Sequence, residues 1–149
     1  MPFVPEDFDV PLGLEGPGFV LEPLGPQHNE RDHQAWMSSI DFIHTLPGFD
    51  GPDDRWPTPM SLEENLGDLE RHARDFSERA GFTYTVLDPA TSDVIGCLYV
   101  YPSKDGRHDG DVRSWVRASH QELDRPLRLA IVEWLEEAWP FTAPAFVVR

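Results

Sequence analysis

The sequence holds few basic residues, and this shortage argues against several classes of partner. Lys104 is the only lysine, and 12 basic residues stand against 27 acidic ones, which gives a net charge of −15. This charge repels phosphate backbones, and no basic run offers counterion release, so neither nucleic acid nor an anionic membrane surface is an expected partner. A small cation or a basic protein would be attracted, although the charge also fits a surface that serves solubility alone.

The sequence also lacks a second cysteine, a long apolar run and a metal-binding pattern. Cys97 stands alone, so no internal disulfide can form, and the redox compartment stays open. Residues 1–7 have neither the basic stretch nor the apolar core of a secretory signal, and no apolar run reaches the ~18 residues of a membrane span. The histidines show no ligand spacing. We therefore expect a cytoplasmic protein with no metal site.

The length and the distribution of proline and glycine predict one domain with an N-terminal arm. A chain of 149 residues fits a single domain, which we take as residues 1–149. Residues 1–18 contain four prolines and three glycines, so they form an extended arm that either wraps over the domain or stays mobile. Residues 46–60 are similarly rich in proline and glycine and predict an irregular loop.

Two helices are predicted in the first half of the chain, after a short strand over Phe19–Glu22. The first helix begins at Pro26 and runs to about Ile40, with an apolar stripe that includes Trp36. The second begins with a capping box, in which Ser61 and Glu64 satisfy two backbone amides reciprocally. Its predicted stripe is Leu62, Leu66, Leu69, Ala73, Phe76 and Ala80, and Gly81 would end it in a left-handed conformation.

The second half of the chain predicts a strand hairpin, a third strand, a helix and a last strand. Alternating aromatic and β-branched residues indicate the strands, and apolar residues at helical spacing indicate the helix, which Pro140 ends. The predicted class is α/β, with a mixed, mostly antiparallel sheet flanked by three helices. The predicted ranges are strands 82–87, 94–101 and 112–118, a helix over 127–138 and a strand over 145–149.

Three short motifs carry a resemblance to a known family. Residues 19–24, Phe-Val-Leu-Glu-Pro-Leu, are similar to the opening strand of the GCN5-related N-acetyltransferases. Residues 93–96, Asp-Val-Ile-Gly, are similar to the start of that family's third strand, and Trp115-Val116 resembles its fourth strand. The resemblance covers residues 19–149. It implies the family fold, acetyl-CoA as cofactor, and transfer of an acetyl group to an amine.

The resemblance also implies a cofactor site, in which the sequence departs from the family pattern. In the family a glycine-rich loop lets the backbone approach the CoA diphosphate at a helix N-terminus. Here Asp124 and Pro126 stand at the small-residue positions; the acid repels a diphosphate and can cap the helix, and proline removes an amide. The implied cofactor-binding residues are Trp115, Val116, Arg117, Gln121, Arg125 and Arg128.

Candidate chemical groups lie on the predicted strands and the first helix. Asp111 and Glu22 are candidate general bases, although each also fits a solvated charge at a strand edge. Ile95, Cys97, Tyr99 and Tyr101 are expected on one strand face. Aromatic residues indicate a substrate pocket under a lid formed by residues 46–60, although core packing explains most of them equally well; these residues are Trp36, Trp56, Tyr84, Tyr99 and Tyr101.

Two functions stay open at this point, together with a question of assembly. The first is an acyl-CoA-dependent N-acetyltransferase acting on a small, cationic amine. The second is a catalytically degenerate relative that binds a ligand without acetyl transfer, because no residue matches the family's tyrosine acid and the sequence stops at Arg149, after the fifth strand of the family. In addition, the last strand, residues 145–149, could pair with its twin in a homodimer.

Overall fold

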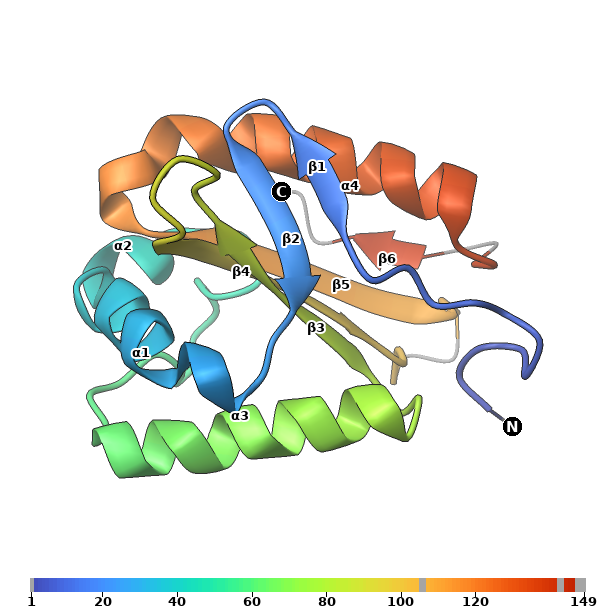
Figure 1. Ribbon diagram of the computed structural model, residues 1–149, viewed down its shortest axis with the longest axis horizontal. Helices are drawn as coiled ribbons and strands as arrows, with labels where there is room; N and C mark the ends of the chain where they lie inside the picture. Colours follow the sequence, from blue (N-terminus) through green and yellow to red (C-terminus); the bar gives the residue numbers. More distant parts are fainter. Residues whose placement is uncertain (1, 105–106, 142–143, 147–149) are drawn as a thin grey trace.

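The computed structural model describes residues 2–104, 107–141 and 144–146, and within them the chain forms a six-stranded sheet with strand order β1-β2-β3-β4-β5-β6 (Figure 1). Neighbouring strands are antiparallel, except that β6 is parallel to β5. This arrangement confirms the predicted α/β class with a mixed, mostly antiparallel sheet. The strands are β1 (Leu14–Gly16), β2 (Phe19–Pro23), β3 (Phe82–Leu87), β4 (Val94–Tyr101), β5 (Gly110–Val116) and β6 (Pro144–Phe146).

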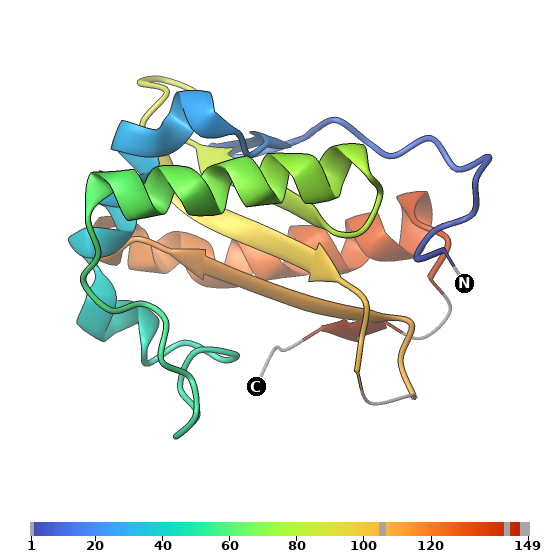
Figure 2. The ribbon, with the colours of Figure 1, turned by 90° about the horizontal axis from the view of Figure 1, so that it is seen from below.

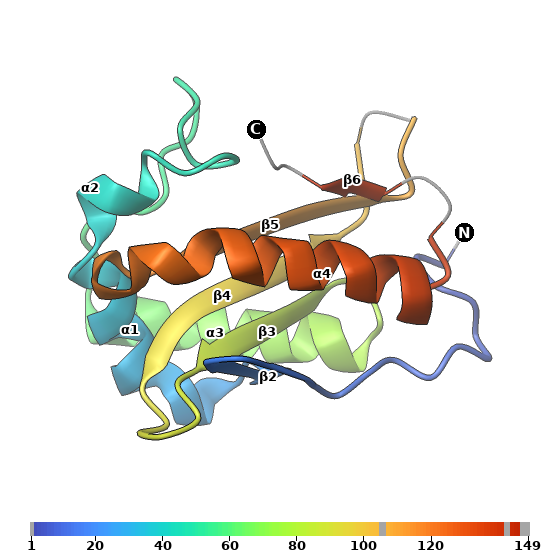
Figure 3. The same cartoon turned by 90° about the horizontal axis from the view of Figure 1, so that it is seen from above.

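Helices cover both faces of this sheet. Figure 2 shows α3 (Leu62–Ser77) along one face and α4 (Asp124–Ala138) behind the opposite face. Figure 3 shows the reverse view, with α4 in front of the strands. On the α3 side the described helices also include the short pair α1 (Asn29–Met37) and α2 (Ile40–Ile43). None of the described helices is long and apolar enough to cross a membrane.

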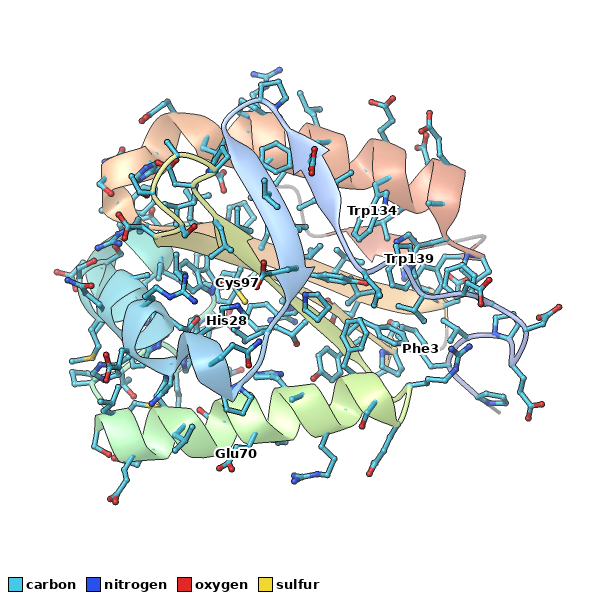
Figure 4. All side chains as sticks on the ribbon, in the orientation of Figure 1. Phe3, His28, Glu70, Cys97, Trp134 and Trp139 are labelled. Carbon is cyan, nitrogen blue, oxygen red and sulfur yellow. The ribbon has the colours of Figure 1, made fainter. Side chains whose placement is uncertain are left out.

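The alternation of side chains along the strands builds two separate cores. The α4 core lies between the sheet and α4, where Leu127 and Ile131 meet Phe82 and Val112. The α1/α3 core lies on the other face, where Trp36 meets Cys97 and Trp115. Figure 4 shows Trp134 and Trp139 beside α4 and Cys97 near α1. The position of a residue along β4 or β5 therefore decides whether its side chain packs in the α4 core or in the α1/α3 core.

The assignment of faces along β4 corrects one expectation. The register between β3 and β4 shifts at Val86/Leu87, so Ile95 is an extra residue between two paired positions. Ile95 consequently packs into the α4 core, while Cys97 and Tyr99 belong to the opposite face. The predicted common face for Ile95, Cys97, Tyr99 and Tyr101 is wrong at Ile95, because a bulge resets the two-residue alternation.

The first predicted helix is divided. A short 3₁₀ turn (Pro26–His28) precedes α1, which ends at Met37, and Ser39 leaves helical geometry before α2 begins. Ser38 Oγ donates to the Ala35 carbonyl at 2.8 Å, and Ser39 Oγ accepts the Ala118 amide at 2.8 Å. Ser38 thus makes a local hydrogen bond and Ser39 a long-range one, and both compete with a continuous helix, which the apolar spacing alone did not reveal.

The capping box of α3 is confirmed, but its predicted stripe is rotated. Ser61 Oγ accepts the Glu64 amide at 3.1 Å, and Glu64 accepts the Ser61 amide at 3.2 Å. The buried positions of α3 are Asn65 and Leu69, whereas Leu62 is exposed. The predicted helix end is also wrong: Arg79, not Gly81, adopts the positive φ of 61°. A side chain at Gly81 would instead meet the Tyr101 ring.

The N-terminal arm is wrapped over the domain, which decides between the two alternatives left open. Val4 is buried, Phe3 stacks on Phe82 with ring centroids 5.9 Å apart, and Phe8 contacts Trp139. The end of the arm is not irregular, because β1 pairs with β2 across a turn in which Gly18 has a φ of 84°. The arm therefore closes one side of the α4 core.

The C-terminal half follows the predicted order with shifted boundaries. β5 begins and ends two residues before the predicted range 112–118, because its pairing with β4 runs from Asp111 to Val116. A 3₁₀ segment (Ala118–Leu123) leads directly into α4, which begins three residues before the predicted position 127. β6 pairs with β5 at residues 144–146. Residues 147–149 of the predicted last strand lie outside the described residues.

The capping box gives the first prediction. Replacing Ser61 by alanine removes the acceptor of the Glu64 amide, so Ser61→Ala should lower the free energy of unfolding by about 1 kcal/mol in chemical denaturation. Ser77→Ala, at the far end of α3, is the control and should change stability by less than about half as much, since Ser77 is exposed and caps no orphan amide. Equal effects of the two substitutions would contradict the capping role.

Candidate functional site

A cavity of about 490 Å³ opens on the α1/α3 face of the sheet. Its walls come from α1, α3, β4 and β5, and the irregular segment between α2 and α3 closes one side with Phe49 and Trp56. This volume is in the range of small-molecule sites. The lining residues are Leu24, Asp32, Trp36, Phe49, Trp56, Asn65, Asp68, Leu69, Arg71, His72, Tyr99, Tyr101, Asp111 and Arg113.

Aromatic rings form one wall of this cavity. Trp56 is the central ring, with its centroid 5.5 Å from Trp36, 5.8 Å from Phe49 and 6.4 Å from Tyr99. Trp115 lies behind it at 6.0 Å and donates its indole N–H to the Tyr99 hydroxyl at 2.9 Å. The rings are tilted or perpendicular to one another, so the wall presents both faces and edges to the cavity.

Asp32 places a carboxylate at the buried end of the cavity. Its side chain is almost fully buried on α1, and Oδ2 accepts a hydrogen bond from Asn65 Nδ2 at 3.1 Å. The Asn65 carbonyl oxygen in turn accepts the Trp36 indole N–H at 3.1 Å. Burial raises the pKa of Asp32 to about 6, and the hydrogen bond from Asn65 opposes that rise. The carboxylate is thus held in place by an amide and remains largely ionised at neutral pH.

The rim of the cavity carries further charges that are already paired. Arg113 Nε lies 3.2 Å from Asp111 Oδ1, and its guanidinium is also 3.8 Å from Asp54 Oδ1. Arg113 also donates to the Gly48 carbonyl at 2.9 Å, which ties β5 to the irregular segment. On α3, Arg71 lies 3.9 Å from Asp68. The two guanidinium groups of the cavity therefore face carboxylates of their own.

His72 contributes an imidazole that is hydrogen-bonded through Nδ1. The Tyr101 hydroxyl donates its proton to Asp75 Oδ2 at 2.9 Å, so in its 3.0 Å contact with His72 Nδ1 it acts as the acceptor. In the tautomer that makes this bond Nδ1 carries the hydrogen and Nε2 faces an Arg71 nitrogen at 3.5 Å, whereas in the other tautomer the Thr83 hydroxyl, 3.0 Å away, can donate to Nδ1. Burial lowers the pKa of His72 to about 4, with the Arg71 charge acting in the same direction. The ring is neutral at physiological pH.

Four of the five aromatic residues predicted for a substrate pocket line this cavity, and one does not. Trp36, Trp56, Tyr99 and Tyr101 are brought together here from α1, the irregular segment and β4. Tyr84 lies on the opposite face of the sheet, in the α4 core, and its hydroxyl donates to the Pro11 carbonyl of the arm. The alternation of β3 explains the difference, because Thr83 and Thr85, not Tyr84, face the α1/α3 side.

The two predicted general bases occupy different surroundings. Asp111 lines the cavity rim in its ion pair with Arg113. Glu22 lies on β2 outside the residues that line the cavity, and its carboxylate is 2.7 Å from Nε2 of the buried His28. A catalytic role of Asp111 therefore stays a prediction that the geometry allows, whereas Glu22 fits the partner of a buried histidine.

The predicted diphosphate segment is helical instead of an open loop. The Asp124 amide is already donated to the Gln121 carbonyl, where the 3₁₀ segment passes into α4. Asp124 does not cap the helix: its Oδ2 pairs with Arg128 at 2.7 Å, and its buried Oδ1 has no hydrogen-bond partner among the described residues. Burial raises the pKa of Asp124, against the nearby Arg128 charge. Gln121 and Arg125 are exposed beside this pair.

The remaining cofactor candidates are divided between the two faces of β5. Val116 is buried in the α4 core, and Trp115 belongs to the aromatic wall. Arg117 follows the strand and donates to the Val94 carbonyl at 3.2 Å. The β4–β5 register is uninterrupted from Gly96↔Val116 to Tyr101↔Asp111, so along these paired residues no bulge turns a β5 amide toward an oxyanion. These candidates do not converge on one point.

Sequence reasoning missed three polar groups of the cavity, Asp32, Asn65 and His72. A signal was present in the sequence, because Asp32 precedes Trp36 by four residues and therefore shares its helical face. Likewise Asn65, Leu69 and His72 follow one another at steps of four and three. The predicted apolar stripes passed over these polar residues because burial of a charge is rare without a partner, and the partners come from another helix.

Comparison with known proteins gives the fold. No protein-family model and no curated protein matches the chain. Among solved structures, the chain is similar to ribosomal-protein-S5-alanine acetyltransferase from Vibrio fischeri, with a TM-score of 0.60 and 15% identity over 87% of this chain and 69% of that one. The microcin C7 self-immunity acetyltransferase, solved with acetyl-CoA and AMP, gives a TM-score of 0.62 and 12% identity over 87% and 70%.

A third similar solved structure is also that of an acetyltransferase. It is the acetyl transfer enzyme from Salmonella typhimurium that modifies the N-terminal serine of ribosomal protein L7/L12, with a TM-score of 0.59 and 11% identity over 81% of this chain and 66% of that one. At such identities the likeness concerns the fold. The chain has the fold of the GCN5-related N-acetyltransferases, as residues 19–149 indicated.

The burial of Asp32 predicts an unusual stability effect. Its folded-state pKa of about 6 lies above the ordinary value of 3.8, so its contribution to stability is fully present below about pH 4 and is lost as pH rises through 6. At about 1.4 kcal/mol for each pKa unit, the ionised group costs up to about 3 kcal/mol at neutral pH. Asp32→Asn, which keeps an oxygen acceptor for Asn65, should therefore stabilise the protein at pH 7.

The measurement is the difference in unfolding free energy between the variant and the wild type at several pH values. We expect this difference to grow between pH 4 and pH 7 for Asp32→Asn and to stay flat for Glu30→Gln, which removes an exposed carboxylate from the same helix. A variant that is destabilised equally at both pH values would contradict a raised pKa at Asp32. A gain in stability from replacing a charged cavity residue is typical of a functional group.

Proposed function

We propose that the protein is an N-acetyltransferase that moves an acetyl group from acetyl-CoA to a small amine bound in the cavity on the α1/α3 face. The observation that carries the proposal is the cavity itself, with the Asp32 carboxylate at its buried end, on a sheet of the acetyltransferase fold. The similar solved structures named above are acetyltransferases, and one was solved with acetyl-CoA. These likenesses support the class of reaction and leave the acceptor to be inferred from the cavity.

On the acceptor side, the chain supplies binding and proton acceptance. Asp32 would hold the ammonium form of the amine through a charge-assisted hydrogen bond, while Asn65 fixes the orientation of the carboxylate. An amine must lose a proton before its nitrogen lone pair can attack a carbonyl carbon. Asp32 is the carboxylate placed to take up that proton, and its pKa of about 6 in the free protein makes it a stronger base than an ordinary aspartate.

On the cofactor side, a diphosphate would depend on side chains more than on backbone amides. The orphaned Asp124 Oδ1 and the occupied Asp124 amide show that the start of α4 is not an open cradle. Arg125 is exposed in this segment and would hold the anion as a guanidinium donor, whereas Arg117 and Arg128 would first have to leave the Val94 carbonyl and Asp124. Bound acetyl-CoA supplies an acetyl thioester with a good leaving group, so the proposal does not require a protein acid.

A second candidate function rests on the same segment. The Asp124–Arg128 pair and Pro126 oppose a diphosphate at the start of α4, which favours a relative that binds the amine and has lost transfer. In that case the cavity keeps its ligand, and acetyl-CoA does not bind. A homodimer through the last strand stays a separate prediction, since β6 lies at one end of the strand order and part of the predicted strand is outside the described residues.

Transfer is tested by the release of free CoA thiol from acetyl-CoA in the presence of a panel of small amines. The chain suits this assay, because its single thiol, Cys97, is buried. We expect amine-dependent release by the wild type, a loss of tenfold or more in Asp32→Asn, and little change in Glu30→Gln. No amine-dependent release, together with no binding of acetyl-CoA at millimolar concentration, would contradict the proposal and favour the second candidate.

The altered cofactor segment gives a separate prediction. Removing the Asp124 charge removes a negative group from the start of α4, so Asp124→Asn should tighten the binding of CoA several-fold. Glu122→Gln is the matched control, since Glu122 is exposed in the same segment. Calorimetry with CoA measures both. If Asp124→Asn binds CoA no more tightly than Glu122→Gln does, Asp124 is not opposing the diphosphate.

A further inference from the structure

We infer that the cavity on the α1/α3 face selects an organic cation, and more specifically an ammonium group attached to an apolar or aromatic body, with Asp32 as its counter-ion. The inference deepens the proposed function, and it rests on that function only for what happens to the amine after binding. Cation binding itself requires no cofactor. The juxtaposition that supports it is one buried carboxylate facing a wall of tilted aromatic rings.

The charge of the Asp32 carboxylate is the first reason to expect a cation in the cavity. Asp32 is an anionic group whose described hydrogen bond comes from a neutral amide, Asn65 Nδ2. Within the described part of the chain no ion pair reaches it, although a positive charge on the neighbouring His33 would stabilise it. The arginines of the lining face other acids: Arg113 is 3.2 Å from Asp111, and Arg71 is 3.9 Å from Asp68. A buried carboxylate without a cationic partner is costly, and a ligand cation would relieve that cost.

The aromatic wall of the cavity is the second reason to expect an organic cation. Trp36 and Trp56 are 5.5 Å apart and tilted by 51°, and Tyr99 stands nearly perpendicular to Trp56. Indole rings attract a cation over their faces more strongly than other aromatic side chains do, and several rings around one position form a cage for ammonium groups. The same rings offer apolar surface to the body of the ligand. The wall therefore favours the binding of a ligand that combines a positive charge with an apolar group.

Anions and neutral apolar molecules fit the cavity less well than an organic cation does. An anion would meet Asp32 at the buried end of the cavity and the other lining carboxylates, Asp68 and Asp111, at the rim. A neutral apolar molecule would leave the Asp32 charge buried without a partner. The overall charge of −15 also favours the approach of cations over anions. An organic cation is the class that satisfies the walls and the carboxylate together.

The test is binding of four probes to the full chain without acetyl-CoA, followed by NMR of the tryptophan indole N–H groups. The probes are phenethylammonium, neutral 2-phenylethanol, anionic phenylacetate, and benzyltrimethylammonium, which cannot be acetylated. We expect phenethylammonium to bind at least tenfold more tightly than 2-phenylethanol, and phenylacetate to bind more weakly than either. The resonances of Trp36 and Trp56 should move, while those of Trp134 and Trp139, in the opposite core, should not.

Variants assign the effect to named groups. Asp32→Asn should weaken phenethylammonium binding tenfold or more, whereas Glu30→Gln, which removes the same charge from an exposed position of α1, should change it less than twofold. Trp56→Ala should weaken binding several-fold, because Trp56 contacts four other rings of the wall. Trp56 lies in the irregular segment, so this variant tests the wall without altering a helix or a strand.

The pH dependence of the wild type gives a readout that needs no variant. Benzyltrimethylammonium keeps its charge at every pH, so its affinity reports the protein alone. Affinity should fall as pH drops through about 6 and Asp32 becomes protonated, and Asp32→Asn should show no such fall. The other described titratable or charged groups that face Asp32 or the cavity are His33, Asp68, Arg71, His72, Cys97, Tyr99, Tyr101, Asp111 and Arg113.

Each outcome of these measurements either supports or overturns the selection of an organic cation by the cavity. Cation preference that depends on Asp32, with shifts at Trp36 and Trp56, supports the inference even if no acetyl transfer occurs, and it then favours the binding relative over the enzyme. Equal affinity for the cation and the alcohol, unchanged binding in Asp32→Asn, shifts at Trp134 instead of Trp56, or no binding of either cation at millimolar concentration would each overturn it.

Discussion

The hydrogen bond from Asn65 to Asp32 is the interaction on which the rest of the site depends. It links α1 to α3 across the sheet face and holds a carboxylate where burial alone would favour its neutral form. The Trp36 indole donates to the same amide, so the charged group and the aromatic wall are oriented together. A cavity lined by rings alone would be an apolar pocket; the amide-supported carboxylate makes it selective.

The two faces of the sheet differ in how well they suit the proposed transfer. On the α1/α3 face, a cavity, a positioned carboxylate and a neutral imidazole are in place. On the α4 face, the segment in which the family resemblance implies a diphosphate site is a helical turn closed by the Asp124–Arg128 pair. Since β4 and β5 present alternate side chains to the two faces, changes near α4 leave the cavity intact. The cavity face and the α4 face of such a fold can therefore diverge separately.

The fold was predictable from the sequence to a greater extent than the site. Local signals fixed α3 through the Ser61–Glu64 capping box, and alternation fixed β3, β4 and β5. The break at Ser38 and Ser39 was not predictable, because the Ser39 hydroxyl accepts an amide from residue 118, far along the chain. Asp32 and Asn65 were missed for the same reason: each is polar at a buried position, and its partner lies on another helix. Tyr84 was assigned to the wrong face because composition does not reveal which side of a strand is covered by which helix.

Asp32 is proposed as the counter-ion of a bound organic cation, and the carboxyl carbon of Asp32 reports on this role. An NMR titration of that carbon can be recorded with and without saturating benzyltrimethylammonium. We expect an Asp32 pKa of about 6 in the free protein and a clear decrease of that pKa when the cation is bound, since a cation and a carboxylate stabilise each other. An Asp32 pKa that is the same in both samples would contradict it.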